Sequence, residues 1–247
     1  MQRTLILGAT SAIAAEAAVL HATRGDRLHL VGRNPDKLAD VARRCERATV
    51  TTAVADFDDL DGNEALARDA IAALGGGVDR VLVAHGDLGN QLASERAFAE
   101  AHAILRTNFV SVVSLLIPLA NAMEAARSGR IGVITSVAGE RGRPRNFTYG
   151  AAKGALNVYL QGLRTRLYPA GVSVTTLKLG PVDSPMTAGH KKHALFGKPP
   201  AVARSIVSAM DAGDAEVYVP SFWAAIMPIV RNTPERVFQR LSFLSGR

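Results

Sequence analysis

The chain has 247 residues, of which 48% are hydrophobic and 21% charged, a mix typical of a globular protein with a large core. Its single cysteine excludes an internal disulfide, and no uninterrupted apolar run is long enough to predict a membrane span. The net charge of +7 fits nucleic acid, an anionic cofactor or an anionic membrane surface. Because no groove-reading helix or aromatic RNA-stacking motif is present, we expect no nucleic-acid partner.

Apolar runs of strand length alternate with helical stretches along the chain. The expected strands are residues 3–7, 28–31, 49–54, 81–84, 131–136, 172–179 and 216–219. The expected helices are residues 13–24, 35–45, 63–74, 97–126, 148–168 and 201–210, with Gly25 and Gly129 as helix stops. Near-continuous Val, Ile and Leu runs are typical of buried parallel strands. The alternation predicts an α/β fold, a doubly wound, mostly parallel seven-stranded Rossmann-type sheet with helices on both faces.

No linker, internal repeat or low-complexity stretch divides the sequence. We therefore expect one domain over residues 1–247, with residues 220–247 as a C-terminal tail within it. The start of the chain shows no secretory pattern, because only a short apolar stretch precedes Gly8. Together with the lone Cys45, this indicates the reducing cytoplasm.

A serine, a tyrosine and a lysine stand at a spacing that suits proton transfer. Ser136 ends the fifth strand, and Tyr149 and Lys153 lie one helical turn apart in the next helix, on the same face. An ammonium group held close to a phenol favours the phenolate and lowers the pKa of the tyrosine. Tyr149 would then be a general acid or base, with Ser136 holding a substrate oxygen. The alternative is a chance Tyr-x-x-x-Lys on an ordinary helix.

The first strand runs into Leu7-Gly8-Ala9-Thr10-Ser11-Ala12-Ile13-Ala14. Gly8 would make the tight turn, and the helix that begins near Ser11 offers unpaired N–H groups to a phosphate. A plain strand–turn–helix is the alternative for this glycine-poor loop.

With both motifs and this alternation, the chain resembles the short-chain dehydrogenase/reductase family over nearly its whole length. That family usually has T-G-x-x-x-G-x-G where this chain has Leu7, Gly8, Ala12 and Ala14. Alanine is acceptable at the last position, which serves close helix–strand packing. Ala12 is the real departure, because it adds a methyl group where backbone approaches the pyrophosphate.

The resemblance implies NADP(H) as the preferred cofactor, with NAD(H) as the alternative. An NAD enzyme would carry an acid after the second strand, whereas this chain has Arg33, which can meet a 2′-phosphate or stack on adenine. An exposed arginine beginning a helix is the other interpretation. The cofactor-binding residues that the resemblance implies are Gly8, Thr10, Ser11, Ala12, Ile13, Arg33, Asp56, Phe57, Ala84, His85, Gly86, Tyr149, Lys153, Val182 and Ser184.

The resemblance also assigns catalytic roles. Ser136 would orient the substrate oxygen, Tyr149 would transfer the proton, and Lys153 would lower the pKa of Tyr149 and bind the ribose. Asn108 would hold a helix kink and a water of the proton relay. His85 is expected beside the nicotinamide ribose and not as a metal ligand, since no second ligand is paired with it, and no metal is expected.

Residues 180–184 resemble the family pattern P-G-x-V-x-T, in which Val182 and Ser184 would face the nicotinamide carboxamide. Residues 186–198, rich in Gly, His and Lys, look like the loop that covers the substrate.

The C-terminal tail differs from that of an ordinary reductase. From Pro234 onward, Val237, Phe238, Leu241 and Leu244 would share one face of a basic amphipathic helix. Such a helix can lie in a membrane interface, or its apolar face can pack on the body or on a second subunit. Residues 182–188 and 217–231 look like the branch of decaprenylphosphoryl 2-keto-pentose reductases, which implies a keto-sugar on a polyprenyl phosphate as one substrate.

We therefore expect an NADP(H)-dependent oxidoreductase that reduces a carbonyl or oxidises a secondary alcohol on a small-molecule or lipid-linked substrate. The expected location is cytoplasmic, with peripheral contact at the inner face of the membrane as the alternative. The family implies a homodimer or homotetramer formed through the two long helices. The rival interpretation is a non-catalytic dinucleotide-binding sensor or scaffold, motivated by the altered glycine loop.

Overall fold

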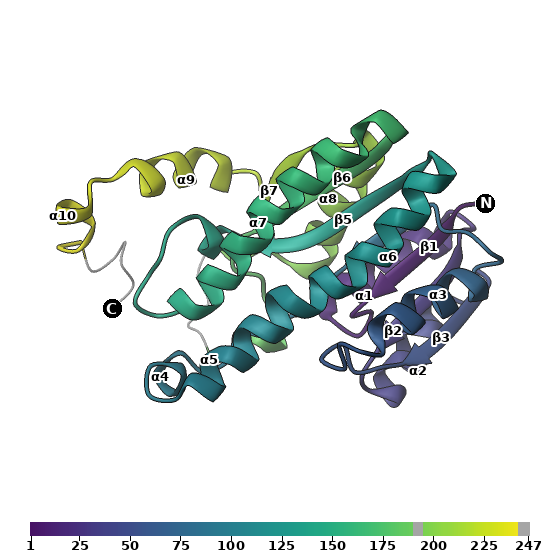
Figure 1. Cartoon of the computed structure of the whole chain (residues 1–247), viewed down its shortest axis with the longest axis horizontal. Coiled ribbons are helices and arrows are strands. Elements are labelled where there is room, and N and C mark those ends of the chain that lie inside the picture. Colours follow the sequence, from purple (N-terminus) through teal and green to yellow (C-terminus); the bar gives the residue numbers. More distant parts are fainter. Residues whose placement is uncertain (190–194, 242–247) are drawn as a thin grey trace.

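The computed structural model describes residues 1–189 and 195–241 (Figure 1). Its strands are β1 (Arg3–Leu7), β2 (Arg27–Gly32), β3 (Val50–Val54), β4 (Arg80–Val83), β5 (Gly129–Ser136), β6 (Val172–Leu179) and β7 (Glu216–Val219). Its helices are α1 (Ala12–Thr23), α2 (Pro35–Arg44), α3 (Asn63–Ala73), α4 (Gln91–Ser94), α5 (Phe98–Leu105), α6 (Ser111–Ala126), α7 (Phe147–Leu167), α8 (Pro199–Ala212), α9 (Trp223–Asn232) and α10 (Glu235–Phe238).

All seven strands form one parallel sheet in the order β3-β2-β1-β4-β5-β6-β7, so the predicted doubly wound fold is confirmed. The chain begins in the middle of the sheet, builds outward to β3, and returns to β4 on the other side of β1. The carboxyl ends of β1 and β4 therefore lie at the point where the strand order reverses, which is where open α/β sheets bind ligands.

Successive strand residues supply two separate cores because side chains alternate between the faces of the sheet. Leu5 and Leu7 of β1 pack with α3, α6 and α7, whereas Ile6 packs with α1, α2 and α8. Figure 1 shows α6 and α7 lying across one face of the sheet. Both faces are covered, which explains why the strands are continuous apolar runs.

The expected helix 97–126 is one helical run with a π-helical segment, Arg106–Val110, between α5 and α6. Asn108 lies in that segment. Its Nδ2 donates to the carbonyl of Ile104 at 3.0 Å, the acceptor that the Asn108 amide would use in a regular α-helix. The side chain thus bonds to the backbone one turn earlier in the same helical run.

The run Phe98–Ala126 is long and apolar enough to cross a membrane by length and composition alone. Val112, Leu115, Leu116 and Leu119 nevertheless lie buried in the core between α6 and the sheet. Core helices of globular proteins pass the same test, so this run carries no argument for a membrane span.

The stop of α6 differs from the expected one at Gly129. Arg127 takes the left-handed conformation at the end of the helix, with φ 51°, while Gly129 already begins β5. A hydrogen bond of 2.9 Å from the Arg127 guanidinium to the Pro169 carbonyl holds the side chain there. Gly25, the other expected stop, does adopt a positive φ of 74° directly after α1.

The C-terminal tail packs on the body of the protein. Trp223, Met227, Val230 and Phe238 form a small core with Val137, the residue that follows β5. The amphipathic helix expected from Pro234 spans only α10 in the part of the chain that the structure describes, and Leu244 lies outside that part. Its apolar residues do not share one face, because Phe238 is buried while Val237 is exposed.

Arg141 holds this tail in place. Its guanidinium donates to the carbonyls of Arg231 at 3.0 Å and Thr233 at 2.9 Å, pairs with Glu235 at 2.7 Å, and lies over the Phe238 ring at 4.2 Å. These contacts cap the carboxyl end of α9 and fix the start of α10. Packing on the body, one of the two alternatives for the tail, therefore accounts for Phe238.

Candidate active site

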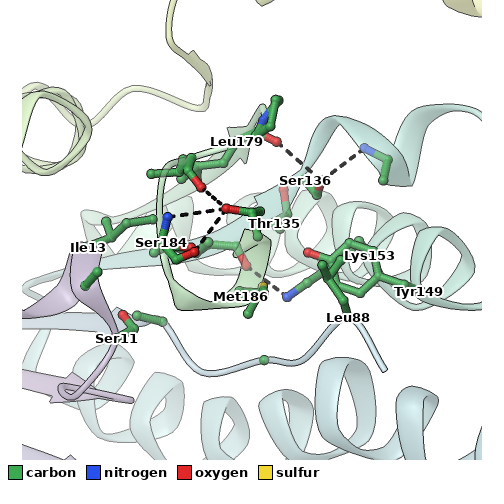
Figure 2. A pocket seen from close by; sticks show the side chains of 18 of the residues that line it. Ser11, Ile13, Leu88, Thr135, Ser136, Tyr149, Lys153, Leu179, Ser184 and Met186 are labelled. Carbon is green, nitrogen blue, oxygen red and sulfur yellow. Dashed lines mark hydrogen bonds between the residues drawn. The ribbon is translucent and has the colours of Figure 1, made fainter. Parts of the chain in front are cut away.

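A cleft of about 990 Å³ lies at the carboxyl ends of the central strands. Its walls are built by the segments that follow β1, β2, β4, β5 and β6 and by the start of α9. A volume at the upper end of the usual range for ligand sites suits a molecule as large as a dinucleotide. Figure 2 shows Ser11 and Ile13 on one side of the cleft and Tyr149 with Lys153 on the other.

The loop between β1 and α1 forms one wall of the cleft. Gly8 adopts φ 82°, and a Cβ there would come within 2.5 Å of the His85 amide nitrogen, so only glycine fits. Ser11 caps α1 by accepting a hydrogen bond from the Ala14 amide at 3.1 Å. The amides of Ala12 and Ile13 have no carbonyl one turn behind them, and both residues line the cleft. This helix start suits a pyrophosphate.

Two cations stand beside this loop at the end of β2. Arg33 and Lys37 are both exposed and both line the cleft. Thr10 of the loop packs closely on Gly32, the last residue of β2, because a Cβ on Gly32 would lie 3.0 Å from the Thr10 methyl group. The two charges therefore stand where an additional phosphate on an adenosine ribose would be attracted. Lys37 was not among the residues singled out from the sequence, although its spacing from Arg33 places it on the first turn of α2.

His85 is a wall residue and not an acid or base. Its ring stacks on Phe57 at 4.3 Å between centroids, and Nε2 is 2.9 Å from the Ser111 hydroxyl. Burial, followed by the charges of Lys153 and Arg33, lowers the pKa of His85 to about 3, so the imidazole is neutral at physiological pH. Among the other residues expected to bind the cofactor, Phe57, Ala84 and Gly86 line the cleft, whereas Asp56 is exposed and outside its lining.

Close packing of α7 against the segment after β5 brings Tyr149 to Ser136. A Cβ on Gly150 would lie 2.8 Å from the Ala138 carbonyl, and one on Gly154 would lie 2.9 Å from the Gly139 carbonyl. Any larger residue would push the helix away from the strand. The Ser136 hydroxyl donates to the Leu179 carbonyl at 3.3 Å and accepts from the Ala138 amide at 3.1 Å (Figure 2).

The sequence predicts that Lys153 lowers the pKa of Tyr149, but in the structure of the protein alone the pKa of Tyr149 is raised. Burial raises the pKa of Tyr149 to about 12, and a hydrogen bond with Ser136 opposes this only in part. Burial also lowers the pKa of Lys153 to about 8. The Lys153 ammonium donates to the Ile134 carbonyl at 3.2 Å and lies 5.7 Å from the centre of the Tyr149 ring. Desolvation therefore outweighs the attraction between the two groups.

Asn108 lies behind this group and does not line the cleft. Its Oδ1 accepts from the Asp87 amide at 3.2 Å, and its Nδ2 donates to the Asp87 carbonyl at 2.7 Å. A Cβ on Gly86 would lie 2.8 Å from Oδ1 and 3.4 Å from the Lys153 ammonium nitrogen. Asn108 thus fixes the loop after β4 against the π-helical segment, close to Lys153.

Val182 and Ser184 line the cleft on the side of β6. Thr187 organises this turn: its hydroxyl donates to the Val182 carbonyl at 2.6 Å and accepts from the Ser184 amide at 3.3 Å. Val182 also pairs with Gly197, which ties down the far end of the expected substrate loop. Residues 190–194 of that loop lie outside the described part of the chain.

Arg143, Arg145 and Trp223 are among the residues that line the cleft although the sequence did not single them out as site residues. Trp223 comes from α9, far along the chain, and only the docking of the tail brings it to the site. No local motif signals any of the three. Within residues 1–189 and 195–241, no group of three or more His, Cys, Asp or Glu is placed to hold a metal ion.

Comparison with known proteins gives a consistent result. The family model described as short chain dehydrogenase matches residues 2–194. An uncharacterized oxidoreductase of Mycobacterium tuberculosis is 35% identical over 240 residues, covering 96% of each chain. One of Streptomyces coelicolor is 32% identical over 238 residues, covering 96% of this chain and 94% of the relative.

Two solved structures share the fold. Levodione reductase has a TM-score of 0.82 at 22% identity, covering 91% of this chain and 98% of its own. A variant of actinorhodin polyketide ketoreductase with NADPH has a TM-score of 0.80 at 20% identity, covering 90% and 96%. At these identities the likeness shows the architecture alone.

Proposed function

The chain belongs to the short-chain dehydrogenase family and is an oxidoreductase, and from that premise we propose that it interconverts a carbonyl and a secondary alcohol with NADP(H) as its cofactor. The observation that carries the proposal is the convergence of Ser136, Tyr149 and Lys153 on one side of a cleft. The other side has the glycine turn and helix start that suit a dinucleotide.

Tyr149 is the proton donor for reduction. Because burial holds its pKa near 12, its hydroxyl is protonated at neutral pH and can donate to a substrate oxygen as negative charge develops there. Ser136 turns its own hydroxyl proton from the Leu179 carbonyl toward the same oxygen. The dinucleotide supplies or accepts the hydride when bound. Oxidation of an alcohol runs the same proton transfer backward, onto the Tyr149 phenolate.

Lys153 stabilises that phenolate. Its ammonium lies on the same face of α7 as Tyr149, near the Gly86 backbone that lines the cleft. A positive charge held in a poorly solvated site acts strongly on a negative charge that forms beside it. From the same position Lys153 would bind a ribose hydroxyl of the dinucleotide, while Val182 and Ser184 would face the carboxamide.

The preference for NADP(H) rests on Arg33 and Lys37. Both would attract the 2′-phosphate, which NADH lacks, so their loss should weaken the binding of NADPH far more than that of NADH. The double change Arg33→Ala, Lys37→Ala should raise the Kd for NADPH about tenfold. This corresponds to a free energy near the lower limit for charge-assisted hydrogen bonds, which we expect because both groups are exposed. The Kd for NADH, measured by the same fluorescence titration, should stay within about twofold. An equal loss for both cofactors would contradict this assignment.

Tyr149→Phe tests the reaction itself. The change removes one hydroxyl and should lower NADPH oxidation with a panel of ketones by about 10²- to 10⁴-fold, the range typical of general acid catalysis. The Kd for NADPH should change little, because the ring is kept. Near-normal turnover by the variant would overturn the proposed role of Tyr149.

Four finer predictions from the sequence stay predictions. A homo-oligomer is supported by exposed apolar residues on the long helices, such as Ile117 and Val158. Peripheral membrane contact by the tail is supported by the exposed Ile229 and Val237. A keto-sugar on a polyprenyl phosphate and a cytoplasmic location rest on the sequence alone.

A further inference from the structure

Arg143 and Arg145 both line the cleft from the segment that joins β5 to α7. They lie six and four residues before Tyr149, in the segment that leads into α7. Arg143 is half-buried, and its Nη2 lies 3.9 Å from the sulfur of Met227 in α9. Arg145 is exposed at the same rim.

Contacts between neighbours connect Arg143 to Ser136. Met227 lies one turn after Trp223 in α9, and Trp223 is 7% exposed and lines the cleft. The indole packs so closely on Gly180 that a Cβ there would come within 2.0 Å of Nε1. Gly180 follows Leu179, whose carbonyl accepts from the Ser136 hydroxyl. Trp223 therefore borders the cleft near Ser136, and Arg143 joins the same wall through Met227.

The Arg143 guanidinium has one weak acceptor among the described residues, the Met227 sulfur, to which Nη2 donates. Among residues 1–189 and 195–241, neither Arg143 nor Arg145 makes an ion pair, whereas Arg141 pairs with Glu235 and three carbonyls. The Arg143 Nε and the Trp223 Nε1 are buried without a hydrogen-bond partner. Burial lowers the pKa of Arg143, but a guanidinium keeps its proton at any physiological pH. Burying a cation without an acceptor costs free energy unless a ligand supplies the missing hydrogen bonds.

The cofactor phosphates do not account for this pair. Arg33 and Lys37 stand at the end of β2, and β1 and β4 separate β2 from β5. Three strand spacings separate β2 from β5 by roughly 14 Å, and the two sets of cations follow these two different strands. The start of α1, which suits the pyrophosphate, also lies on the β1 side. The charge of Arg143 is therefore available to the substrate.

We propose that Arg143, with Arg145 beside it, binds an oxyanion on the substrate, so that the enzyme acts on carbonyl compounds that carry a carboxylate or a phosphate. The planar guanidinium suits either group, since it can donate two parallel hydrogen bonds. The inference rests on the proposed function, because it names the substrate class of the same site.

The test uses matched pairs of ketones with the full-length protein and NADPH. Levulinate is compared with methyl levulinate, and dihydroxyacetone phosphate with dihydroxyacetone, so that the two arms distinguish carboxylate from phosphate. Arg143→Gln should lower kcat/KM for the preferred anion about 10- to 100-fold relative to its neutral partner, and Arg143→Lys should recover part of this preference. Arg204→Gln, on the exposed face of α8, makes the same charge change and should leave both values unchanged.

A second readout does not depend on turnover. Trp223 is the only tryptophan of the chain, so its fluorescence reports on this wall of the cleft. Levulinate or dihydroxyacetone phosphate should change it saturably in the wild type, the neutral partners should not, and Arg143→Gln should abolish the response. If no ketone is reduced but this anion response is seen, the proposed reaction fails and the anion site stands. An equal response to acids and neutral partners, or a response that survives in Arg143→Gln, overturns the inference.

Discussion

In α7, burial moves the pKa values of two neighbouring side chains in opposite directions. It raises the pKa of Tyr149 to about 12 and lowers that of Lys153 to about 8, because both charged forms lose water. The phenol is therefore kept protonated, ready to donate, while the amine titrates close to physiological pH. The sequence identified both residues but predicted the opposite direction for Tyr149. Spacing along a helix shows which side chains are neighbours, but it does not show how much solvent each retains.

The titration of Lys153 predicts the pH dependence of reduction. Its folded-state pKa lies below the ordinary value of 10.5, so the ammonium is fully present only well below pH 8 and is lost as the pH rises through about 8. Without that charge the Tyr149 phenolate is less stable, and kcat/KM for ketone reduction should fall about tenfold per pH unit above this value. The measurement is a pH–rate profile from pH 6 to 10.

Lys153→Arg is the control for this profile, because arginine keeps its charge over the whole range. Its reduction rate, lower though it is, should no longer fall above pH 8. If the fall persisted in Lys153→Arg, Tyr149 and not Lys153 would be the titrating group, and the pKa order inferred from burial would be wrong.

Among the helices and strands, α7 is the one whose packing brings Tyr149 and Lys153 next to Ser136. The helix contacts the segment after β5 through Gly150 and Gly154, and this close approach sets the position of Tyr149 relative to Ser136. The Tyr-x-x-x-Lys spacing was visible in the sequence, but nothing in the sequence showed that these two glycines carry the helix against residues 137–140. Contacts between segments far apart in the chain are what a single sequence does not reveal.

Gly154→Ala tests this contact. The added methyl would come within 2.9 Å of the Gly139 carbonyl, so the helix or the segment must shift. We expect a loss of about 1–3 kcal/mol in the free energy of unfolding, as in other overpacked sites, together with a lower kcat. Urea unfolding and steady-state kinetics measure the two effects.

Gly162→Ala is the matched control in the same helix, because a Cβ there meets nothing within 4 Å. This change should stabilise the protein by about 0.5–1 kcal/mol, since alanine favours the helix over glycine, and should leave kcat unchanged. If Gly154→Ala behaved like Gly162→Ala, close packing of α7 would not position the site.

For the whole molecule, the doubly wound parallel sheet and both covered faces could be predicted from apolar runs and their alternation with helices. The glycine turn at Gly8 and the cleft residues that follow each strand could be placed because parallel strands end at one edge of the sheet. The docking of α9 on the body could not be predicted from the sequence, because it depends on the contacts of Arg141 and on the packing of Trp223 against Gly180. The substrate wall of the cleft was therefore the part that sequence patterns missed.

The most direct test of the proposed site is a crystal structure of the complex with NADP⁺. The nicotinamide ring should lie beside Ser136 and Tyr149, with room for a carbonyl carbon about 3–3.5 Å from the hydride-bearing carbon and its oxygen about 2.6–3.2 Å from the Tyr149 hydroxyl. The 2′-phosphate should lie between Arg33 and Lys37. A nicotinamide ring outside the cleft, or on the side away from Tyr149, would contradict the proposed reaction.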